Sequence, residues 1–472
     1  MKKINIIAGL IVFMSLISCG EDFLSPDPIS AVGAAGYFQT ESQLETGVIN
    51  IYDGMQGVNT TGNNSNRAVQ LEFYLSEMRS DNTRTKSSEG EAAQFENYTI
   101  ESNNGIIADY YRSMYAIIYK ANTVLENLSV ASTGAAAQFE GEAKFARAYA
   151  YFQLVRLYGD VPLIDVVVGP LDTEKQFTRV ATDQVYSLIV SDLQTAAANL
   201  DNSFKTRASK AAAQALLAKV HLTQGNYGDA RSLCESVVGS GFSLESNFKD
   251  VFYNEGNNEV IFAIGYISDD ANDSQNFSAE WLNAVGRTTG VNYPTDEAVA
   301  ALDELGGNRA AFSYRVDALQ PIHHQVVKYL PDGDASLGIA ATSGDPTLAG
   351  NDWIVLRYAD VLLMHVEAIM AGSAMTNDPA ALASFQAVRD RAGITETVQL
   401  ITKDDLLNER RVELAFENQR LFDLIRFGVA QNVLADFAAN NGFGFTANDL
   451  LLPIPDGEIG LSNGMLTQNP GY

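Results

Sequence analysis

The feature that most constrains the fold is a pair of helices encoded by residues 207–239. Small or apolar residues recur at helical spacing on both sides of the turn sequence Gly225-Asn226-Tyr227. These residues are Ala211, Ala215, Ala218 and Leu222 before the turn, and Ala230, Cys234 and Val237 after it. A single helical hairpin cannot bury its own apolar face. The chain must therefore stack this hairpin against further helices.

The spacing from Leu217 to Ala230 matches a tetratricopeptide unit, in which small residues let two antiparallel helices approach closely. Amphipathic stretches elsewhere supply the partners that the hairpin needs. Helices are predicted over residues 106–128, 139–158, 183–200, 353–371, 379–392 and 402–427. The last begins with a capping box, Thr402 followed by Asp405. A layer of stacked helices is the expected core of the domain.

Residues 240–350 have a different character. Gly, Asn, Asp and Pro are scattered through them, and apolar runs such as residues 260–264 are too short for most helices. We predict loops and small strands there, on the side that carries function. The expected fold is mainly α: tetratricopeptide-like helical hairpins, packed against a loop-rich region with short strands. A single domain is expected over residues 41–472, with the helical layer at about 105–239, the loop-rich insertion at about 240–350, and further helices and a tail at 351–472.

The N-terminus predicts a lipid anchor. Two lysines, an apolar stretch over residues 4–16 and small residues before Cys19 are typical of a bacterial lipoprotein signal. The apolar stretch is too short for a permanent membrane helix. We expect cleavage after residue 18, acylation of Cys19, and a tether over residues 19–40 that holds the domain at the membrane.

Charge and cysteine content exclude several classes of protein. Removal of residues 1–18 takes away two of the 31 basic residues, and the remaining 29 face 58 acidic ones, a formal net charge of −29. Such a field repels phosphate backbones, so nucleic acid is excluded as a partner. With Cys19 acylated, Cys234 has no disulfide partner and is predicted to be a buried packing residue. The adjacent His323 and His324 do not suit one metal ion, and no metal site or cofactor is predicted.

Glu409, Glu413 and Glu417 form an i, i+4 ladder of carboxylates in the predicted helix 402–427. Paired carboxylates are the catalytic groups of glycosidases. Here nearby acids have a cation three residues away: Arg410 precedes Glu413, Arg420 follows Glu417, and Arg426 follows Asp423. Nearby arginine lowers a carboxyl pKa, whereas a catalytic acid needs a raised one. An ion-paired framework is therefore predicted, with no catalytic residues.

Several stretches resemble the RagB/SusD family of Bacteroidetes outer-membrane lipoproteins. They are residues 145–152 (FARAYAYF), 158–163 (YGDVPL), 356–363 (LRYADVLL), 388–393 (VRDRAG), 408–414 (NERRVEL), 423–428 (DLIRFG), 452–455 (LPIP) and 468–472 (QNPGY). Glu21 and Asp22, behind Cys19, resemble a surface-export signal of such lipoproteins. The resemblance covers nearly the whole chain apart from residues 240–350. Asn418 stands where the family commonly has Gly, and Phe427 where Trp is frequent; a continuous helix is expected through both.

The resemblance implies a SusD-like fold on the cell surface, anchored in the outer membrane. It also implies a partner, a SusC-like TonB-dependent outer-membrane transporter, over which the protein acts as a lid. Family members bind nutrients, most often glycans, without chemistry on the ligand. The predicted function is capture of an oligosaccharide and its delivery to that transporter. Peptide cargo in the same lid role, or a surface glycoside hydrolase, are the alternatives.

Ligand contacts are sought among aromatic rings, which stack on sugar faces, and planar polar groups, which satisfy hydroxyls. Two segments offer this mixture, one before the helical layer and one in the loop-rich region. The candidates are Phe73, Tyr74, Asp81, Asn82 and Arg84 in the first, and Trp281, Asn283, Arg287 and Tyr293 in the second. The hypothesis is that both segments face one shallow pocket. Trp353 is expected to open a helix and to serve packing.

Overall fold

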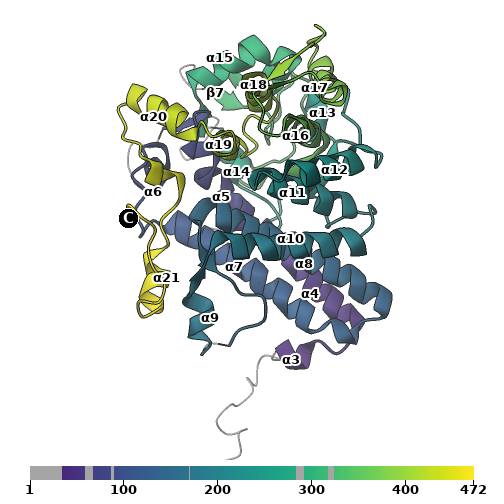
Figure 1. The fold of residues 1–472 in the computed structure, drawn as a ribbon, viewed down its shortest axis with the longest axis vertical. Coiled ribbons are helices and arrows are strands. Elements are labelled where there is room, and N and C mark those ends of the chain that lie inside the picture. The colour runs from purple at the N-terminus through teal and green to yellow at the C-terminus, as the bar shows by residue number, and fades with distance from the viewer. Residues whose placement is uncertain (1–33, 59–66, 87–89, 170, 283–291, 317–323) are drawn as a thin grey trace, which may run out of the picture.

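The computed structural model describes residues 34–58, 67–86, 90–169, 171–282, 292–316 and 324–472. Its main feature is a row of helices in which each packs on the next. The row runs α4 (Glu41–Gln56), α7 (Gly105–Glu126), α8 (Thr133–Tyr158), α10 (Thr182–Asn199), α11 (Lys210–Thr223), α12 (Tyr227–Val238), α16 (Tyr358–Met370) and α17 (Pro379–Arg391). The long early helices lie in the lower half of Figure 1 and the later ones above them. The predicted stack of helical hairpins is confirmed.

The α11–α12 hairpin lies within the predicted residues 207–239, although Tyr227, predicted to belong to the turn, is the first residue of α12. The Ser209 side chain accepts a hydrogen bond from the Ala212 backbone N–H and caps the start of α11. Gly225, at φ 75°, makes the turn at low steric cost. Cys234 is fully buried in the core, as predicted for a packing residue.

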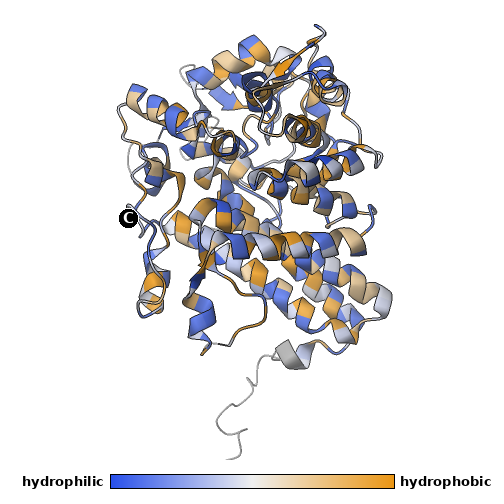
Figure 2. Cartoon of the chain, viewed as in Figure 1, coloured by the Kyte–Doolittle hydropathy of each residue, from blue (hydrophilic) through white to orange (hydrophobic). Residues whose placement is uncertain are grey.

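Helix α8 lies at the centre of the early helices, between α7 and α10. From Phe139 to its end, nearly every residue is buried. Alanines at positions 143, 146 and 150 let the neighbouring helices come close. Figure 2 shows hydrophobic and hydrophilic residues interspersed along these helices. Each fully buried aliphatic or aromatic side chain stabilises the fold by about 1.5–3 kcal/mol.

Two helix predictions in the C-terminal part are wrong at their boundaries. Residues 353–357 form strand β8 (Trp353–Arg357), so Trp353 opens a strand and α16 starts five residues later. The strand pairs antiparallel with β4 (Val260–Ile264), whose residues are all buried. A run of aromatic and branched residues fits a buried ladder well, and pairing with a distant strand overrides the local helical pattern. Trp353 is buried, as expected for a packing residue.

The predicted helix 402–427 is also interrupted. The capping box of Thr402 and Asp405 starts α18 (Lys403–Glu413), but the chain then turns before α19 (Arg420–Arg426). Phe416 and Asn418 have φ 66° and 58° in this turn. Asn is among the residues that best tolerate the left-handed region, where Gly is the usual choice. The expectation of a continuous helix through Asn418 is therefore wrong.

Short strands pair in the described chain, and two of the pairs, β1–β5 and β4–β8, join parts that are far apart in sequence. The antiparallel pairs are β1 (Thr83–Thr85) with β5 (Asn292–Pro294), β2 (Val161–Pro162) with β3 (Arg179–Val180), β4 with β8, β6 (Tyr314–Val316) with β7 (His324–Val326), and β9 (Met375–Thr376) with β10 (Ile401–Thr402). The region predicted to be loop-rich also contains α13 (Phe248–Tyr253), α14 (Phe277–Glu280) and α15 (Asp296–Leu305). α15 packs on α18, so the insertion is joined to the C-terminal helices.

The remaining described elements cover the ends and flanks. They are α3 (Ala34–Tyr37), α5 (Ala68–Leu75), η1 (Glu77–Arg79), α6 (Gly90–Glu96), η2 (Leu128–Val130), α9 (Thr173–Phe177), η3 (Gly307–Phe312), α20 (Ala430–Asn440), η4 (Ala447–Leu450) and α21 (Asp456–Leu461). Helix α3 falls inside the predicted tether, whereas Cys19 and the signal segment lie outside the described residues. None of the helices in the described ranges has both the length and the apolar character needed to cross a membrane.

Candidate functional site

The two segments predicted to carry ligand contacts lie side by side. Strand β1 pairs with β5, and Arg84 stands directly opposite Tyr293. Next to this ladder, the Thr295 N–H donates to the Asn82 carbonyl at 2.9 Å, and the Thr295 hydroxyl donates to the Asp81 carbonyl at 2.9 Å. Asn283 and Arg287 lie outside the described residues.

Trp281 does not present a ring to solvent. It is 1% exposed, and its ring centroid lies 5.8 Å from that of Phe73 and 5.8 Å from that of Phe416. Phe73 is buried as well. The expectation that these two aromatics are available for stacking on a ligand is not met in this conformation. An indole has more apolar surface than any other side chain, and here it fills the contact between α5, α14 and the turn before α19.

Asp81 and Asn82 are buried in a polar contact with the C-terminal helices. The carboxylate of Asp81 accepts two hydrogen bonds from Arg420, at 2.8 and 2.9 Å, and lies 3.1 Å from Arg411. Burial raises the pKa of Asp81, but the two arginines outweigh it and lower the pKa to about 2. Asn82 donates to Glu77 at 3.1 Å and accepts from Arg411 at 2.9 Å. These groups are already engaged within the protein.

Tyr74, Arg84 and Tyr293 are the partly exposed members of the described candidates. The Arg84 side chain donates to Glu96 at 2.5 Å and to Asn441, and its guanidinium lies 5.6 Å from the centre of the Phe443 ring. Tyr74 packs on Phe73, with ring centroids 4.1 Å apart. Partial burial raises the pKa of Tyr293. We refer to Tyr74, Arg84 and Tyr293 as the corner around the β1–β5 ladder. Together they offer two aromatic rings and one guanidinium that Glu96 holds in place.

The carboxylate ladder of α18 is an ion-paired framework, as predicted, but most of its partners are not the expected ones. Glu413 accepts from Arg309 at 2.8 Å, from Arg357 at 2.5 Å and from Arg391. Glu417 accepts from Arg357 at 2.7 Å and from Lys328 at 2.6 Å.

The arginines of the C-terminal helices themselves have other partners. Arg410 binds Asp360 and Asp423, both at 2.9 Å, and Arg420 binds Asp81. Only the pair Arg426–Asp423, at 2.8 Å, is as predicted. Tertiary packing brings in Arg309, Arg357 and Arg391 from elements remote in sequence, which local spacing cannot indicate. The three ladder carboxylates are buried and paired, an arrangement unsuited to glycosidic acid catalysis.

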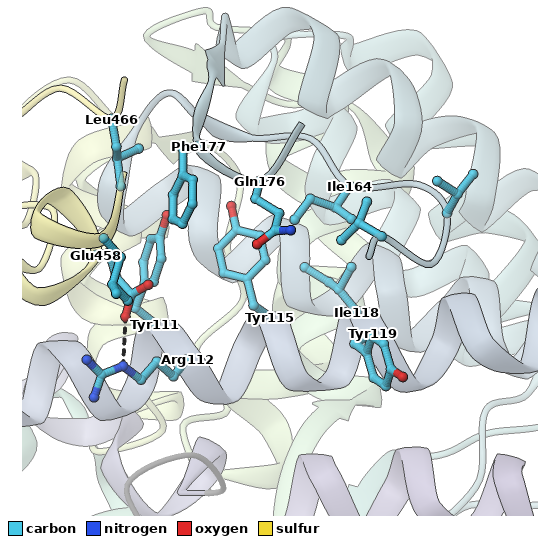
Figure 3. A pocket seen from close by; sticks show the side chains of 13 residues that line it. Tyr111, Arg112, Tyr115, Ile118, Tyr119, Ile164, Gln176, Phe177, Glu458 and Leu466 are labelled. Atoms are coloured by element: carbon cyan, nitrogen blue, oxygen red, sulfur yellow. Dashed lines mark hydrogen bonds and ion pairs between the residues drawn. The ribbon is translucent and has the colours of Figure 1, made fainter. Parts of the chain in front are cut away.

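A cavity of about 300 Å³, which the sequence analysis missed, opens beside α7. Tyr111, Tyr115 and Tyr119 project from one face of this helix, and Figure 3 shows Gln176 and Phe177 of α9 opposite them. The remaining lining residues are Arg112, Ile118, Ile164, Val166, Val168, Glu458, Leu461 and Leu466. Tyrosines at i, i+4 and i+8 were the available sequence signal, because such residues share one helix face.

The described residues contain no cluster of three or more His, Cys, Asp or Glu side chains arranged to hold a metal ion. His324 lies on β7, whereas His323 is outside the described residues. The described residues of the two candidate sites offer aromatic rings and hydrogen-bonding groups.

Known proteins resemble this chain over most of its length. A family described as starch-binding and associating with the outer membrane matches residues 23–222, and the SusD family matches residues 334–472. SusD-like protein P2 of Formosa agariphila is 25% identical, with the whole of both chains covered. The starch-binding protein SusD of Bacteroides thetaiotaomicron is 25% identical over 70% of this chain and 72% of its own.

Solved structures share the fold. A laminarin binding SusD-like protein superposes with a TM-score of 0.75 at 26% identity, covering 92% of this chain and 100% of its own. Surface glycan-binding protein A of Bacteroides thetaiotaomicron, in complex with laminarihexaose, has a TM-score of 0.76 at 20% identity, covering 91% of this chain and 99% of its own. The second likeness concerns the fold alone.

Proposed function

Because the chain belongs to the SusD/RagB family, we propose that it is a glycan-binding lipoprotein of the outer-membrane surface, which captures an oligosaccharide and delivers it to a partner transporter. The proposed role is binding and delivery, without chemistry on the glycan.

One observation carries the glycan part of this proposal. The laminarin binding SusD-like protein matches this chain at 26% identity, and the match takes in the whole of that protein and 92% of this chain. A similarity of this extent supports a common type of ligand more strongly than a shared motif would. It supports carbohydrate as the ligand class and leaves the sugar and linkage open.

The ligand surface of the proposal is the corner around the β1–β5 ladder. Tyr74 and Tyr293 supply rings for sugar faces, and Arg84 supplies a guanidinium fixed by Glu96. Phe73, Asp81, Asn82 and Trp281 are buried, and Phe73 packs directly on Tyr74. Asn283 and Arg287 stay predicted contacts.

The proposal also includes anchoring of the protein in the outer membrane and delivery of the bound glycan to a transporter. Acylated Cys19 would hold the domain at the membrane, and two signals or several chains are needed for stable anchoring. The partner would be a SusC-like TonB-dependent transporter, for which the chain forms a lid. The family description, which associates its members with the outer membrane, supports this location.

The test is calorimetric titration of residues 20–472 with laminarin oligosaccharides, maltohexaose, cellohexaose and an oligopeptide mixture. Saturable binding of one glycan class supports the proposal. Binding of peptides alone would replace glycan by peptide cargo, and release of reducing ends during long incubation would indicate a hydrolase. Co-isolation of a TonB-dependent transporter with the full-length lipoprotein, from detergent-solubilised membranes, tests the delivery role.

A further inference from the structure

We propose that the groove between α7, α9 and α21 is a second binding site for a neutral oligosaccharide, separate from the corner around Arg84 and Tyr293. The two places share no residue and are built from different elements. The ligand class rests on the proposed function, whereas the location rests on the geometry of the groove alone.

The floor of the groove is a ladder of aromatic rings. Tyr111, Tyr115 and Tyr119 are spaced four residues apart on α7, a rise of about 6 Å per step along the helix. Their exposure increases along the ladder, from 4% at Tyr111, which closes the inner end, to 48% at Tyr119. The rings of Tyr115 and Tyr119, which are partly exposed and exposed, can each stack on the apolar face of one sugar unit in an extended chain.

Polar groups at the rim suit the hydroxyls of such a ligand. Arg112 donates through Nε to Glu458 at 2.7 Å, and Gln176 donates through Nε2 to the Gly169 carbonyl at 2.6 Å. Among the hydrogen bonds of the described residues, the terminal nitrogens of Arg112, Oε1 of Gln176 and the Tyr119 hydroxyl are not used. Figure 3 shows Arg112 and Gln176 beside the tyrosine ladder. An aromatic floor with a polar rim is the arrangement that sugars require.

The charge of the groove favours a neutral ligand. Its two charged residues, Arg112 and Glu458, neutralise each other. An anionic sugar would compete with Glu458 for Arg112 in a protein that already carries a large net negative charge. A wholly apolar ligand would leave the rim groups unused. A neutral oligosaccharide satisfies both the rings and the rim.

The shape of the surface favours a ligand longer than one sugar. Tyr119 also lines a second cavity, of about 530 Å³, which is bordered by Phe38, Ile49 and Lys120. Tyr119 therefore borders both cavities. Val166 and Leu461 at its edges are 41% and 65% exposed, which adds to the apolar surface available to a bound chain.

The experiment compares Tyr119→Ala with Phe204→Ala in calorimetric titrations with laminarihexaose, maltohexaose and cellohexaose. Phe204 is a matched control, since it is also an exposed aromatic, 44% exposed, and does not line the groove. We expect two binding events in the wild type. Tyr119→Ala should weaken one of them about 10-fold, Tyr119→Phe less, and Phe204→Ala neither. Because Tyr119 is half exposed, its truncation leaves the core intact, and an unchanged melting temperature checks this.

The outcomes separate the two proposals. A single binding event that Tyr119→Ala leaves unchanged overturns the second site and leaves glycan capture standing. No binding of any of the three glycans by the wild type overturns both. If Tyr119→Ala leaves glycan affinity unchanged but reduces co-isolation of a membrane protein, the groove is a protein contact and the second-site proposal is wrong.

Discussion

Arg420 donates two hydrogen bonds, of 2.8 and 2.9 Å, to the carboxylate of Asp81, a residue 339 positions earlier in the chain. This contact fixes the segment before β1 against α19. The proposed ligand corner is thus held in place by the C-terminal helices. Asp81, a predicted ligand contact, thereby links the segment before β1 to the C-terminal helices.

Asp81→Asn should destabilise the protein by about 3–5 kcal/mol, because Arg420 and Arg411 lose a buried charged partner. Since the pKa of Asp81 is lowered to about 2, its stabilising effect is complete above pH 4 and is lost as the pH falls toward 2. Urea unfolding of both proteins from pH 6 to pH 3 measures this difference. The exposed Asp436→Asn is the control. An equal stability of wild type and Asp81→Asn at pH 6 would contradict the prediction.

Glu413→Gln should be more damaging, since three buried arginines meet at this carboxylate. The cost is expected to be about 3–5 kcal/mol or more. Burial alone would raise the pKa of Glu413, but Arg391, Arg357 and Arg309 hold it well below its usual range. Circular dichroism melts are the measurement, with the exposed Glu396→Gln as control. A melting temperature within two degrees of the wild type would show that the cluster contributes little.

Asn418→Ala and Asn418→Gly separate backbone strain from side-chain contacts. Both remove the buried side-chain amide of Asn418, but only Ala is strained at φ 58°. The Ala variant should be less stable than the Gly variant by about 1 kcal/mol. Chemical denaturation of the two proteins decides, and the reverse order would argue against strain at this turn.

Asp352→Asn should stabilise the protein at alkaline pH. Burial, reinforced by Glu255, raises the pKa of Asp352 to about 7. A carboxyl with a raised folded pKa contributes stability below about pH 4 and loses it as the pH rises through 7. Asn avoids the buried charge and keeps an oxygen for the Tyr266 N–H. Thermal melts should show an advantage of about 1–2 kcal/mol at pH 8 that shrinks at pH 5; a constant difference would be the contrary result.

Tyr293→Ala tests the proposed ligand corner. Loss of one stacking ring should weaken glycan binding about 5–10-fold, with a small effect on stability because the ring is only partly buried. Titration calorimetry measures the change. Tyr227→Ala, a partly exposed tyrosine on α12, is the control. Unaltered affinity in Tyr293→Ala would move the site away from the β1–β5 ladder.

Features that depend on neighbours along the chain were predictable from sequence. The α11–α12 hairpin, the capping box at Thr402 and the burial of Cys234 all follow from spacings of a few residues. The resemblance to the family was equally readable, since it is carried by contiguous motifs. The tyrosine ladder on α7 was also present as a spacing, but a stripe of aromatics does not reveal whether a cavity lies above it.

The sequence by itself therefore determined the class of fold, because helical periodicity and caps act over three or four residues. Only the tertiary structure decided that Trp353 opens a strand, that Trp281 is buried between Phe73 and Phe416, and that Asp81 is held by Arg420. Each of these depends on a partner that is remote in the chain. Exposure, strand pairing and ion pairing are properties of the packed chain. They depend on contacts between residues that are distant in sequence, and a local sequence pattern does not indicate which distant residues will be in contact.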